Sequence, residues 1–495
     1  MIKKIHDMLC SKKISCTELT QNYLNNIKKN NNDLNCYVNI TESNALESAK
    51  KVDNKIKNNQ EINILEGIPM TLKDNISTEN LKTTCCSKIL ENYVPIYNST
   101  VWNNLHKNNS VLLGKTNMDE FAMGSSCETS YFGAAKNPHN LNHVPGGSSG
   151  GAASAVAGNL AVFGLGSDTG GSVRQPASFC GVVGLKPTYG SVSRYGLIAY
   201  ASSFDQIGPI AKSVEDISII FDNISYYDPK DSTSSQILKN NKTNTYENLN
   251  KNIKDIKIGV PREYYNYNNY NSIDPEIKSS LENSMKIYES LGAHIEYFDF
   301  PEIKYTLPVY YILACAEAAS NLSRFDGVRY GFRTENYQNI NEMICKTRSQ
   351  GFGKEVKRRI MLGNYVLSSG YYDAYYKRAQ DMRNKITQKF EENFEKYDVL
   401  LTPTSPVTAF ELNKNYSTPE EIYLSDICTV PVNITGVPAI SVPCGFDHNN
   451  LPIGMQLITK KFGESKLLNI AHQFEINTNF EFSKNLNMGV NICEL

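Results

Sequence analysis

Apolar residues recur at helical spacing through the first 60 positions of the chain. The recurring positions are Ile5, Leu9, Leu19, Tyr23, Leu24, Ile27, Ala45, Ala49 and Val52. This period is typical of amphipathic helices, so residues 1–60 are predicted to form a helical segment packed on the core. Either Ser15 or Thr17 could cap its middle helix, because both hydroxyls precede the second apolar run.

From Gly67 onward, short apolar runs alternate with helical stretches. Strands are predicted at 67–76, 110–114, 256–261, 397–403 and 439–443, and helices at 99–105, 276–293 and 370–396. This alternation indicates an α/β fold, and we expect residues 61–495 to form one domain. Residues 225–255 are rich in Asn, Lys, Ser and Asp, which predicts a mobile surface loop or insertion.

The composition narrows the classes of function. The chain has 50 Lys and Arg residues and 51 Asp and Glu residues, which gives a net charge of −1. This balance argues against a nucleic-acid-binding surface spread over the whole protein. No apolar run reaches 18 residues, so neither a transmembrane helix nor a membrane partner is expected. The twelve cysteines are scattered, without a C-x-x-C pair or a preceding signal peptide, which predicts reduced thiols in a cytosol-like compartment and no metal site.

Two clusters of glycine and hydroxyl residues stand out, at 146–154 and 166–174. Ordering so much glycine loses conformational entropy and destabilises the fold, so these glycines are not expected to serve the hydrophobic core. Glycine does allow a backbone to direct several amide N–H groups at one atom. A serine among such amides has what acyl transfer requires, a nucleophilic oxygen beside donors for a developing oxyanion. We therefore predict that these clusters form the floor of an active site.

Ser172 is the first candidate nucleophile. It follows Thr169-Gly170-Gly171, and Pro176 suits the first turn of a helix that would begin just after the serine. Free backbone N–H groups and the positive end of the helix dipole would then lie close to its hydroxyl. The alternative is a plain N-cap serine, although a cap does not require the preceding glycines.

Ser148 is the second candidate, because Gly146–Gly150 satisfies the G-x-S-x-G pattern of the α/β-hydrolase nucleophile elbow. That elbow needs a strand directly before it, whereas residues 137–145 read as a polar loop. It also needs a downstream acid and histidine. The available histidines, His294, His448 and His472, lie in unremarkable contexts, so the elbow is disfavoured.

Lys73 is the candidate base. It ends an apolar run, where desolvation would favour the neutral amine and lower its pKa. A neutral lysine could take a proton from a serine directly or through a second hydroxyl, which would make Ser148 a relay. The alternative is a solvated lysine at the end of a strand. His139 and His143 read as ordinary polar residues of a loop.

Residues 146–187 and the run Gly67-Ile-Pro-Met-Thr-Leu-Lys-Asp-Asn75 resemble the amidase signature family, as does the spacing of Lys73, Ser148 and Ser172. The resemblance implies a mixed β-sheet covered by helices on both faces. It also implies a catalytic triad, in which Ser172 is the nucleophile, Ser148 the bridge after a cis peptide bond, and Lys73 the base and later the acid. The implied oxyanion hole consists of the amides of Thr169, Gly170, Gly171 and Ser172.

Further motifs are similar to one branch of that family, the A subunits of glutamyl-tRNA(Gln) amidotransferases. These motifs lie at 84–90, 117–124, 318–331, 355–360, 367–375 and 403–406. The branch implies glutamine as the amide donor. The substrate-binding residues that it implies are Arg359 for the carboxylate, Asp426 for the amine, and Tyr310, Met123 and Gly124. Arg358 is a weaker candidate for the carboxylate, and without the resemblance Arg358 and Arg359 would read as surface charges on a helix.

The same resemblance implies that ammonia passes to a tRNA-binding partner, the B subunit of the amidotransferase, in a complex that also holds a small C subunit. ATP and Mg²⁺ are expected on the tRNA-binding partner, with no cofactor in this chain, which has no G-x-x-x-x-G-K-[ST] motif. The expected compartment is a bacterial-type cytoplasm or the matrix or stroma of an organelle. Two alternatives stay open, a stand-alone amidase for another small amide and a non-catalytic scaffold that keeps the fold.

Overall fold

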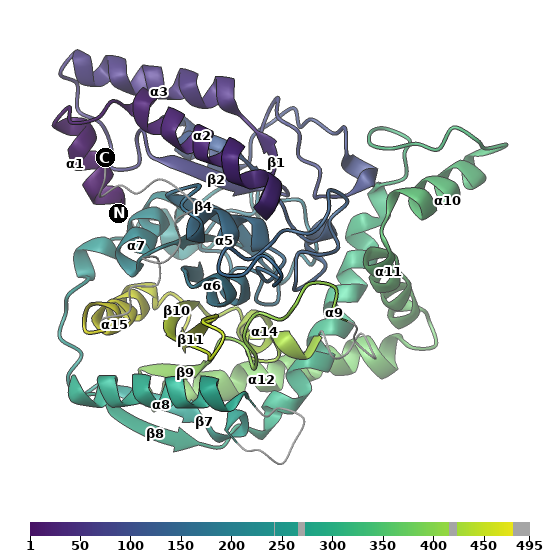
Figure 1. Cartoon of the computed structure of the whole chain (residues 1–495). Helices are drawn as coiled ribbons and strands as arrows, with labels where there is room; N and C mark the ends of the chain where they lie inside the picture. The colour runs from purple at the N-terminus through teal and green to yellow at the C-terminus, as the bar shows by residue number, and fades with distance from the viewer. Residues whose placement is uncertain (242, 266–272, 415–422, 479–495) are drawn as a thin grey trace.

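The structure, a computed structural model, describes residues 1–241, 243–265, 273–414 and 423–478. Within them, eleven strands form one mixed sheet in the order β1-β3-β2-β4-β6-β5-β10-β11-β9-β7-β8 (Figure 1). The strands are β1 (Tyr37–Ile40), β2 (Pro69–Lys73), β3 (Val111–Thr116), β4 (Phe163–Asp168), β5 (Val183–Lys186), β6 (Gln206–Ala211), β7 (Lys257–Pro261), β8 (His294–Phe298), β9 (Val399–Pro403), β10 (Ala439–Phe446) and β11 (Pro452–Ile458). β2 is parallel to both β3 and β4, and β7 is parallel to both β8 and β9, whereas the other pairs are antiparallel.

Helices cover both faces of this sheet, as predicted. They are α1 (Ile2–Cys10), α2 (Cys16–Leu34), α3 (Glu42–Lys57), α4 (Thr100–Lys107), α5 (Gly150–Ala157), α6 (Arg174–Cys180), α7 (Val214–Ile224), α8 (Pro275–Ser290), α9 (Thr306–Asn321), α10 (Ile340–Gly351), α11 (Lys354–Leu367), α12 (Arg378–Phe394), α14 (Val430–Thr435) and α15 (Glu464–Ile476). Neighbouring residues of a strand point to opposite faces. Val399 and Leu401 of β9 accordingly pack in the core with α7, α8 and α15, whereas Leu400 packs with α9, α11 and α12.

The N-terminal segment is largely helical, as its periodicity predicts. The apolar positions of α1, α2 and α3 are buried in the core. Ser15 is the cap of α2, because its hydroxyl accepts the Glu18 amide while the Glu18 carboxylate accepts the Ser15 amide. Thr17 instead hydrogen-bonds Asp53. The pattern missed β1, which adds this segment to the edge of the sheet beside β3.

The predicted strands at 67–76, 110–114, 256–261, 397–403 and 439–443 correspond to β2, β3, β7, β9 and β10. The predicted helices at 99–105 and 276–293 correspond to α4 and α8. Residues 370–396 form a short π-helix (Tyr372–Lys377) that runs into α12. In Figure 1, α10 and α11 project to one side, away from the sheet.

Residues 225–255, apart from position 242, form a loop with two short 3₁₀-helices, Gln236–Lys239 and Tyr246–Asn248, and several of their side chains contact the rest of the protein. The carboxylate of Asp228 accepts hydrogen bonds from the hydroxyls of Ser193 and Thr100, both at 2.6 Å. Leu249 and Ile253 are buried in the core. Asp and Asn are turn-forming residues that bond to nearby groups, so a polar composition is compatible with a segment that is fastened in place.

No helix in the described ranges is both long and apolar enough to cross a membrane. The eleven cysteines of these ranges are all unpaired thiols. Nor do the described residues contain a group of three or more His, Cys, Asp or Glu side chains that could hold a metal ion.

Candidate functional site

The site begins where β2 and β4 end in the middle of the sheet. These strands are parallel neighbours, so their carboxyl ends lie at the same edge, and Lys73 is the last residue of β2. The Lys73 side chain is fully buried. Its Nζ donates to Ser148 Oγ at 2.7 Å, to Ser149 Oγ at 2.9 Å and to the Ser167 carbonyl at 3.2 Å. The alternative of a solvated lysine is therefore wrong.

Burial lowers the pKa of Lys73 to about 8, because a charged amine is poorly solvated there, although Asp119, Cys127, Asp168 and Asp205 oppose this shift. None of the acidic side chains in the described ranges lies within ion-pairing distance of Nζ. The amine is thus held by hydroxyl and carbonyl oxygens alone. Near neutral pH it can exist as a proton acceptor as well as a donor.

The Gly147–Ser148 peptide bond is cis, as the family resemblance implies. The Gly147 amide donates to Gln175 Oε1 at 2.9 Å. A Cβ atom at position 147 would lie 2.0 Å from Asp119 Oδ2, so only glycine fits between this turn and the carboxylate. Ser148 itself is buried and is followed by α5.

The nucleophile-elbow alternative does not fit the structure. The residues before Ser148 form a loop rather than a strand. His448 and His294 are mostly exposed and pair with Glu276 and Asp255, and His472 lies beside Glu475. None of these histidines hydrogen-bonds Ser148 or Ser172 in the described part of the chain. The base that reaches Ser148 is a lysine.

Ser172 lies on the turn between β4 and α6. The N-cap of α6 is Val173, so the alternative that Ser172 caps the helix is wrong. The Ser149 amide donates to the Ser172 carbonyl at 3.1 Å, which holds the two serine segments together. The Ser172 side chain is 7% exposed, and its hydroxyl makes no hydrogen bond within the described residues, to Ser148 or to any other group. It is therefore free to meet a ligand.

The Asp168 carboxylate holds this turn in place through hydrogen bonds to its amides. Its carboxylate accepts the amides of Gly171 at 2.9 Å and Val173 at 3.1 Å, and it forms a fully buried ion pair with Arg174 at 2.9 Å. Burial would raise the pKa of Asp168, but Arg174 and Asn433 hold it at about 2. The carboxylate is therefore ionised, and the turn has a fixed shape.

Of the four amides that the resemblance implies for the oxyanion hole, one already has an acceptor within the protein. The Gly171 amide already donates to Asp168, because the carboxylate folds back under the turn. The amides of Thr169, Gly170 and Ser172 donate to no protein group in the described ranges. These three amides are thus available to an oxyanion beside the Ser172 hydroxyl.

Arg359 lies on the buried face of α11. Its Nη1 donates to the Tyr200 hydroxyl at 2.7 Å and its Nε to Glu355 Oε1 at 2.8 Å. The guanidinium also lies over the rings of Tyr200, Tyr311 and Tyr423, 5.2–5.5 Å from their centroids. The Arg358 side chain, in contrast, is 40% exposed and pairs with Glu355 near the surface. Of the two, Arg358 is the surface charge and Arg359 is part of the interior.

Asp426 is buried near Arg359, and a tyrosine connects the two. The Asp426 carboxylate accepts a hydrogen bond from Ser125 Oγ at 2.6 Å and a longer one, 3.5 Å, from the Tyr311 hydroxyl, whose ring faces the Arg359 guanidinium. Burial raises the pKa of Asp426 to about 7, and Ser125 and Arg359 partly offset this shift. A buried cation and a buried acid thus both contact Tyr311, the cation at its ring and the acid at its hydroxyl.

The remaining predicted residues, Tyr310, Met123 and Gly124, lie beside groups described above. The Tyr310 ring lies against Gly170, where an added Cβ atom would lie 2.6 Å from the tyrosine oxygen. Met123 is buried in the same core cluster as Tyr310. Gly124 lies against Asp119, 2.4 Å from it if a Cβ were added. Tyr310 therefore links the oxyanion turn to the Arg359 side.

Sequence reasoning missed several residues of this site. Ser149 also hydrogen-bonds Lys73, at 2.9 Å against 2.7 Å for Ser148, and the sequence alone does not show that both adjacent serines reach the amine. Tyr200 and Tyr311 contact Arg359 from distant parts of the chain, with no local motif. The resemblance already prefers Arg359 over Arg358, and the helical face that Arg359 shares with Val356, Ile360 and Gly363 supports the same choice from the sequence pattern.

Comparisons with known proteins find relatives over nearly the whole chain. Residues 18–468 match the amidase family. The A subunit of the glutamyl-tRNA(Gln) amidotransferase of Thermoanaerobacter pseudethanolicus is 52% identical, over 96% of this chain and 95% of that relative. The crystal structure of the corresponding Thermotoga maritima protein is 42% identical, with a TM-score of 0.78 over 94% of this chain and 92% of that one. A peptide amidase from Stenotrophomonas maltophilia, 24% identical, shares the fold with a TM-score of 0.81 over 96% of each chain. On these matches over nearly its full length, this chain belongs to the amidase family.

Proposed function

We propose that this chain is the glutamine-hydrolysing subunit of a glutamyl-tRNA(Gln) amidotransferase. One observation supports the chemistry most: in the part of the chain that the structure describes, a buried lysine has no acidic partner and contacts a serine beside a turn with free amides. The substrate assignment is supported by the buried pair Arg359 and Asp426, since free glutamine carries one carboxylate and one ammonium group. The relatives from Thermoanaerobacter and Thermotoga, both named as amidotransferase subunits, support it as well.

In this proposal, neutral Lys73 accepts a proton from Ser148, which takes one from Ser172. The Ser172 oxygen attacks the carboxamide carbon of glutamine and forms the new C–O bond. The amides of Thr169, Gly170 and Ser172 stabilise the oxyanion. Protonated Lys73, again through Ser148, gives its proton to the leaving nitrogen, the C–N bond breaks and ammonia departs. Water then attacks the glutamyl ester by the same relay and releases glutamate and free Ser172.

Arg359 and Asp426 place the substrate in this mechanism. A guanidinium binds two carboxylate oxygens at once, so Arg359 would hold the α-carboxylate. Asp426 would hold the ammonium group, and its pKa of about 7 would fall when that cation arrives. Tyr310, Met123 and Gly124 would line the path of the side chain between this clamp and Ser172.

The proposal extends to partners. Ammonia would pass to the tRNA-binding B subunit, which would use ATP and Mg²⁺ to amidate Glu-tRNA(Gln), and the small C subunit would complete the complex. This chain would touch tRNA mainly through its tRNA-binding partner. Residues 61–495 would act as a single amidase domain, with the segment 1–60 attached through β1.

The test is to purify the complex and to compare three proteins. Wild type should hydrolyse glutamine, and Ser172→Ala should not. Arg359→Ala should lose glutamine use while free ammonia still supports amidation of Glu-tRNA(Gln). If Arg359→Ala retains glutamine hydrolysis, the stand-alone amidase is the better assignment. Unchanged activity in Ser172→Ala would overturn the nucleophile.

A further inference from the structure

A single loop, Tyr200–Asp205, contacts both the turn that carries Thr169 and the side chain of Arg359. Asp205 is buried, and its carboxylate accepts the Thr169 hydroxyl at 2.7 Å. The same carboxylate accepts the amides of Tyr200 at 2.9 Å and Ala201 at 3.1 Å, which closes the loop on itself. At the other end of the loop, the Tyr200 hydroxyl accepts a hydrogen bond from Arg359 Nη1 at 2.7 Å. The loop therefore ties the oxyanion turn to the arginine clamp.

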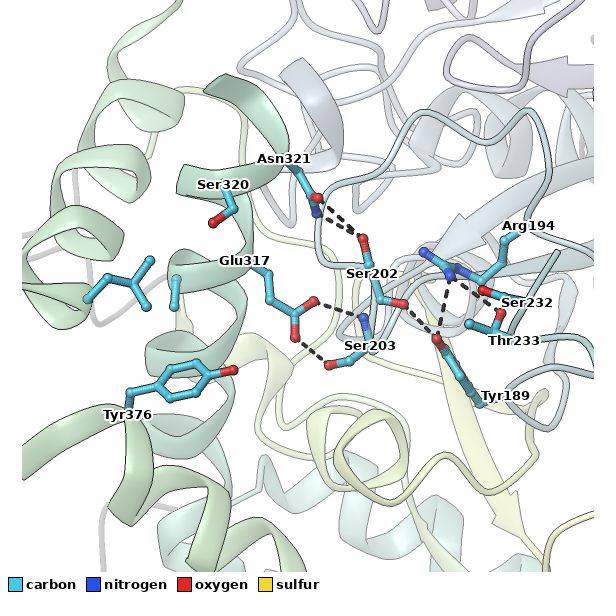
Figure 2. Close-up of a pocket in the computed structure, with 12 residues that line it drawn as sticks. Tyr189, Arg194, Ser202, Ser203, Ser232, Thr233, Glu317, Ser320, Asn321 and Tyr376 are labelled. Atoms are coloured by element: carbon cyan, nitrogen blue, oxygen red, sulfur yellow. Dashed lines mark hydrogen bonds between the residues drawn. The ribbon is translucent and has the colours of Figure 1, made fainter. Parts of the chain in front are cut away.

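The outer side of this loop is fastened as well. Figure 2 shows Ser202 and Ser203 facing a cavity of about 630 Å³, which contains none of the predicted site residues. There the Ser203 amide donates to Glu317 at 2.8 Å, and the Tyr189 hydroxyl donates to the Ser202 carbonyl at 2.7 Å. Asn321 donates to Ser202 Oγ at 3.1 Å. With bonds on both sides, the loop has one defined position.

We infer that Tyr200 and Asp205 are positioning residues for this reaction, with Tyr200 orienting Arg359 toward the substrate carboxylate and Asp205 orienting the Thr169 segment toward the oxyanion. The inference rests on the proposed roles of Arg359 and of the Thr169 amide. Neither residue touches the reacting atoms. Tyr200 acts on substrate binding, and Asp205 acts on the transition state, so their effects separate in kinetics.

The experiment measures kcat and KM for glutamine in variants of the purified complex. Tyr200→Phe removes the acceptor for Arg359 while it keeps the ring, and it should raise KM about tenfold with kcat within about twofold of wild type. Thr169→Val removes only the donor to Asp205, and it should lower kcat about tenfold with KM within about twofold. Thr169→Ser should restore kcat, because it keeps the hydroxyl.

Asp205→Asn tests the carboxylate that bonds both to Thr169 and to the amides of Tyr200 and Ala201. An amide side chain offers one acceptor oxygen in place of two, so Thr169 competes for it with the amides of Tyr200 and Ala201. Both parameters should then change, kcat falling and KM rising. Tyr189→Phe is the matched control, since it removes one hydroxyl bond to the same loop from the cavity side and should leave both parameters within about twofold.

Thermal unfolding of each variant separates a folding defect from a kinetic one. The inference is overturned if Tyr200→Phe leaves KM unchanged, or if Thr169→Val leaves kcat unchanged, in proteins that melt like wild type. It is also overturned if Tyr189→Phe reproduces either effect. Should Arg359→Ala weaken glutamine binding while Tyr200→Phe does not, the proposed function stands and only this inference falls. If wild type does not hydrolyse glutamine, both fall.

Discussion

Lys73 and Lys115 are buried amines at the ends of two neighbouring parallel strands, yet their surroundings differ. Lys115 on β3 has a carboxylate close by, Asp74 at 3.7 Å, and donates to Thr83 Oγ1 and the Ile76 carbonyl. Within the described residues, Lys73 on β2 hydrogen-bonds two serine hydroxyls and one carbonyl and has no carboxylate at ion-pairing distance. Burial lowers the pKa of both amines, and Asp74 opposes that shift at Lys115. A buried lysine with an acidic partner is a structural group, and one without it is available for proton transfer.

Lys73→Met should produce the largest effect. It keeps the length of the side chain and removes the amine, so glutamine hydrolysis should fall about 10,000-fold, as when a member of a catalytic triad is lost. The free energy of unfolding should not decrease, because the cost of burying an amine is removed as well. Steady-state kinetics and urea unfolding measure the two quantities. Activity above about a tenth of wild type would end the role of Lys73 as base.

Lys115→Met is the matched change on the neighbouring strand, with the opposite outcome. It leaves the Asp74 carboxylate buried without its cation, so the free energy of unfolding should fall by about 3–5 kcal/mol. The activity of the folded fraction should stay within about threefold of wild type. Equal losses of activity in Lys73→Met and Lys115→Met would show that the two amines do not differ in function.

The pH profile sharpens the same contrast. With the pKa of Lys73 near 8, the neutral amine increases with pH, so kcat/KM should rise about 100-fold from pH 6 to pH 9. Folding depresses this pKa below its unfolded value of 10.5, so the unfolded chain binds more protons between about pH 8 and 10.5. The contribution of Lys73 to stability should therefore rise with pH across that window. Lys115→Met should keep the rise of kcat/KM and the rise of stability with pH. Lys73→Met should lose the rise of stability between about pH 8 and 10.5.

The smallest effects are expected from single hydroxyls on each amine. Ser149→Ala removes one of the three oxygens around Lys73 Nζ and should lower kcat about tenfold, with unfolding little changed. Thr83→Val removes the corresponding hydroxyl from Lys115 and should lower the free energy of unfolding by about 1 kcal/mol, with kcat unchanged. Reversal of these two outcomes would show that the hydroxyls at Lys73 only support the fold.

Strong local patterns made much of this fold predictable. The run that ends at Lys73 is apolar and becomes β2, and the period in the first 60 residues becomes three helices. β1 was missed because it has four residues, and β6 because Gly208 and Pro209 interrupt it. The contacts of the Asn-rich stretch 225–255 could not be read from its composition, because the serine and the threonine that donate to Asp228, Ser193 and Thr100, lie outside it in sequence.

The candidate site was predictable where a motif is contiguous. The residues next to them in sequence were enough to identify Lys73, Ser148 and Ser172 as candidates, and the fold places Lys73 against Ser148. The capture of the Gly171 amide by Asp168 was not predictable, because it depends on Arg174 and Asn433 closing over the same carboxylate from separate elements. The tyrosines around Arg359 come from three distant segments, and only the folded chain brings them together.

The serines of the site differ in their access to solvent. Ser148 and Ser149 are fully enclosed, while Ser172 keeps 7% of its surface open and its oxygen unbonded within the described residues. An electrophilic label such as a sulfonyl fluoride would therefore find one hydroxyl out of the three, and only in molecules whose lysine has shed its proton. The rate of that labelling would report the charge state of the amine without any turnover, in a chain with no partner and no tRNA.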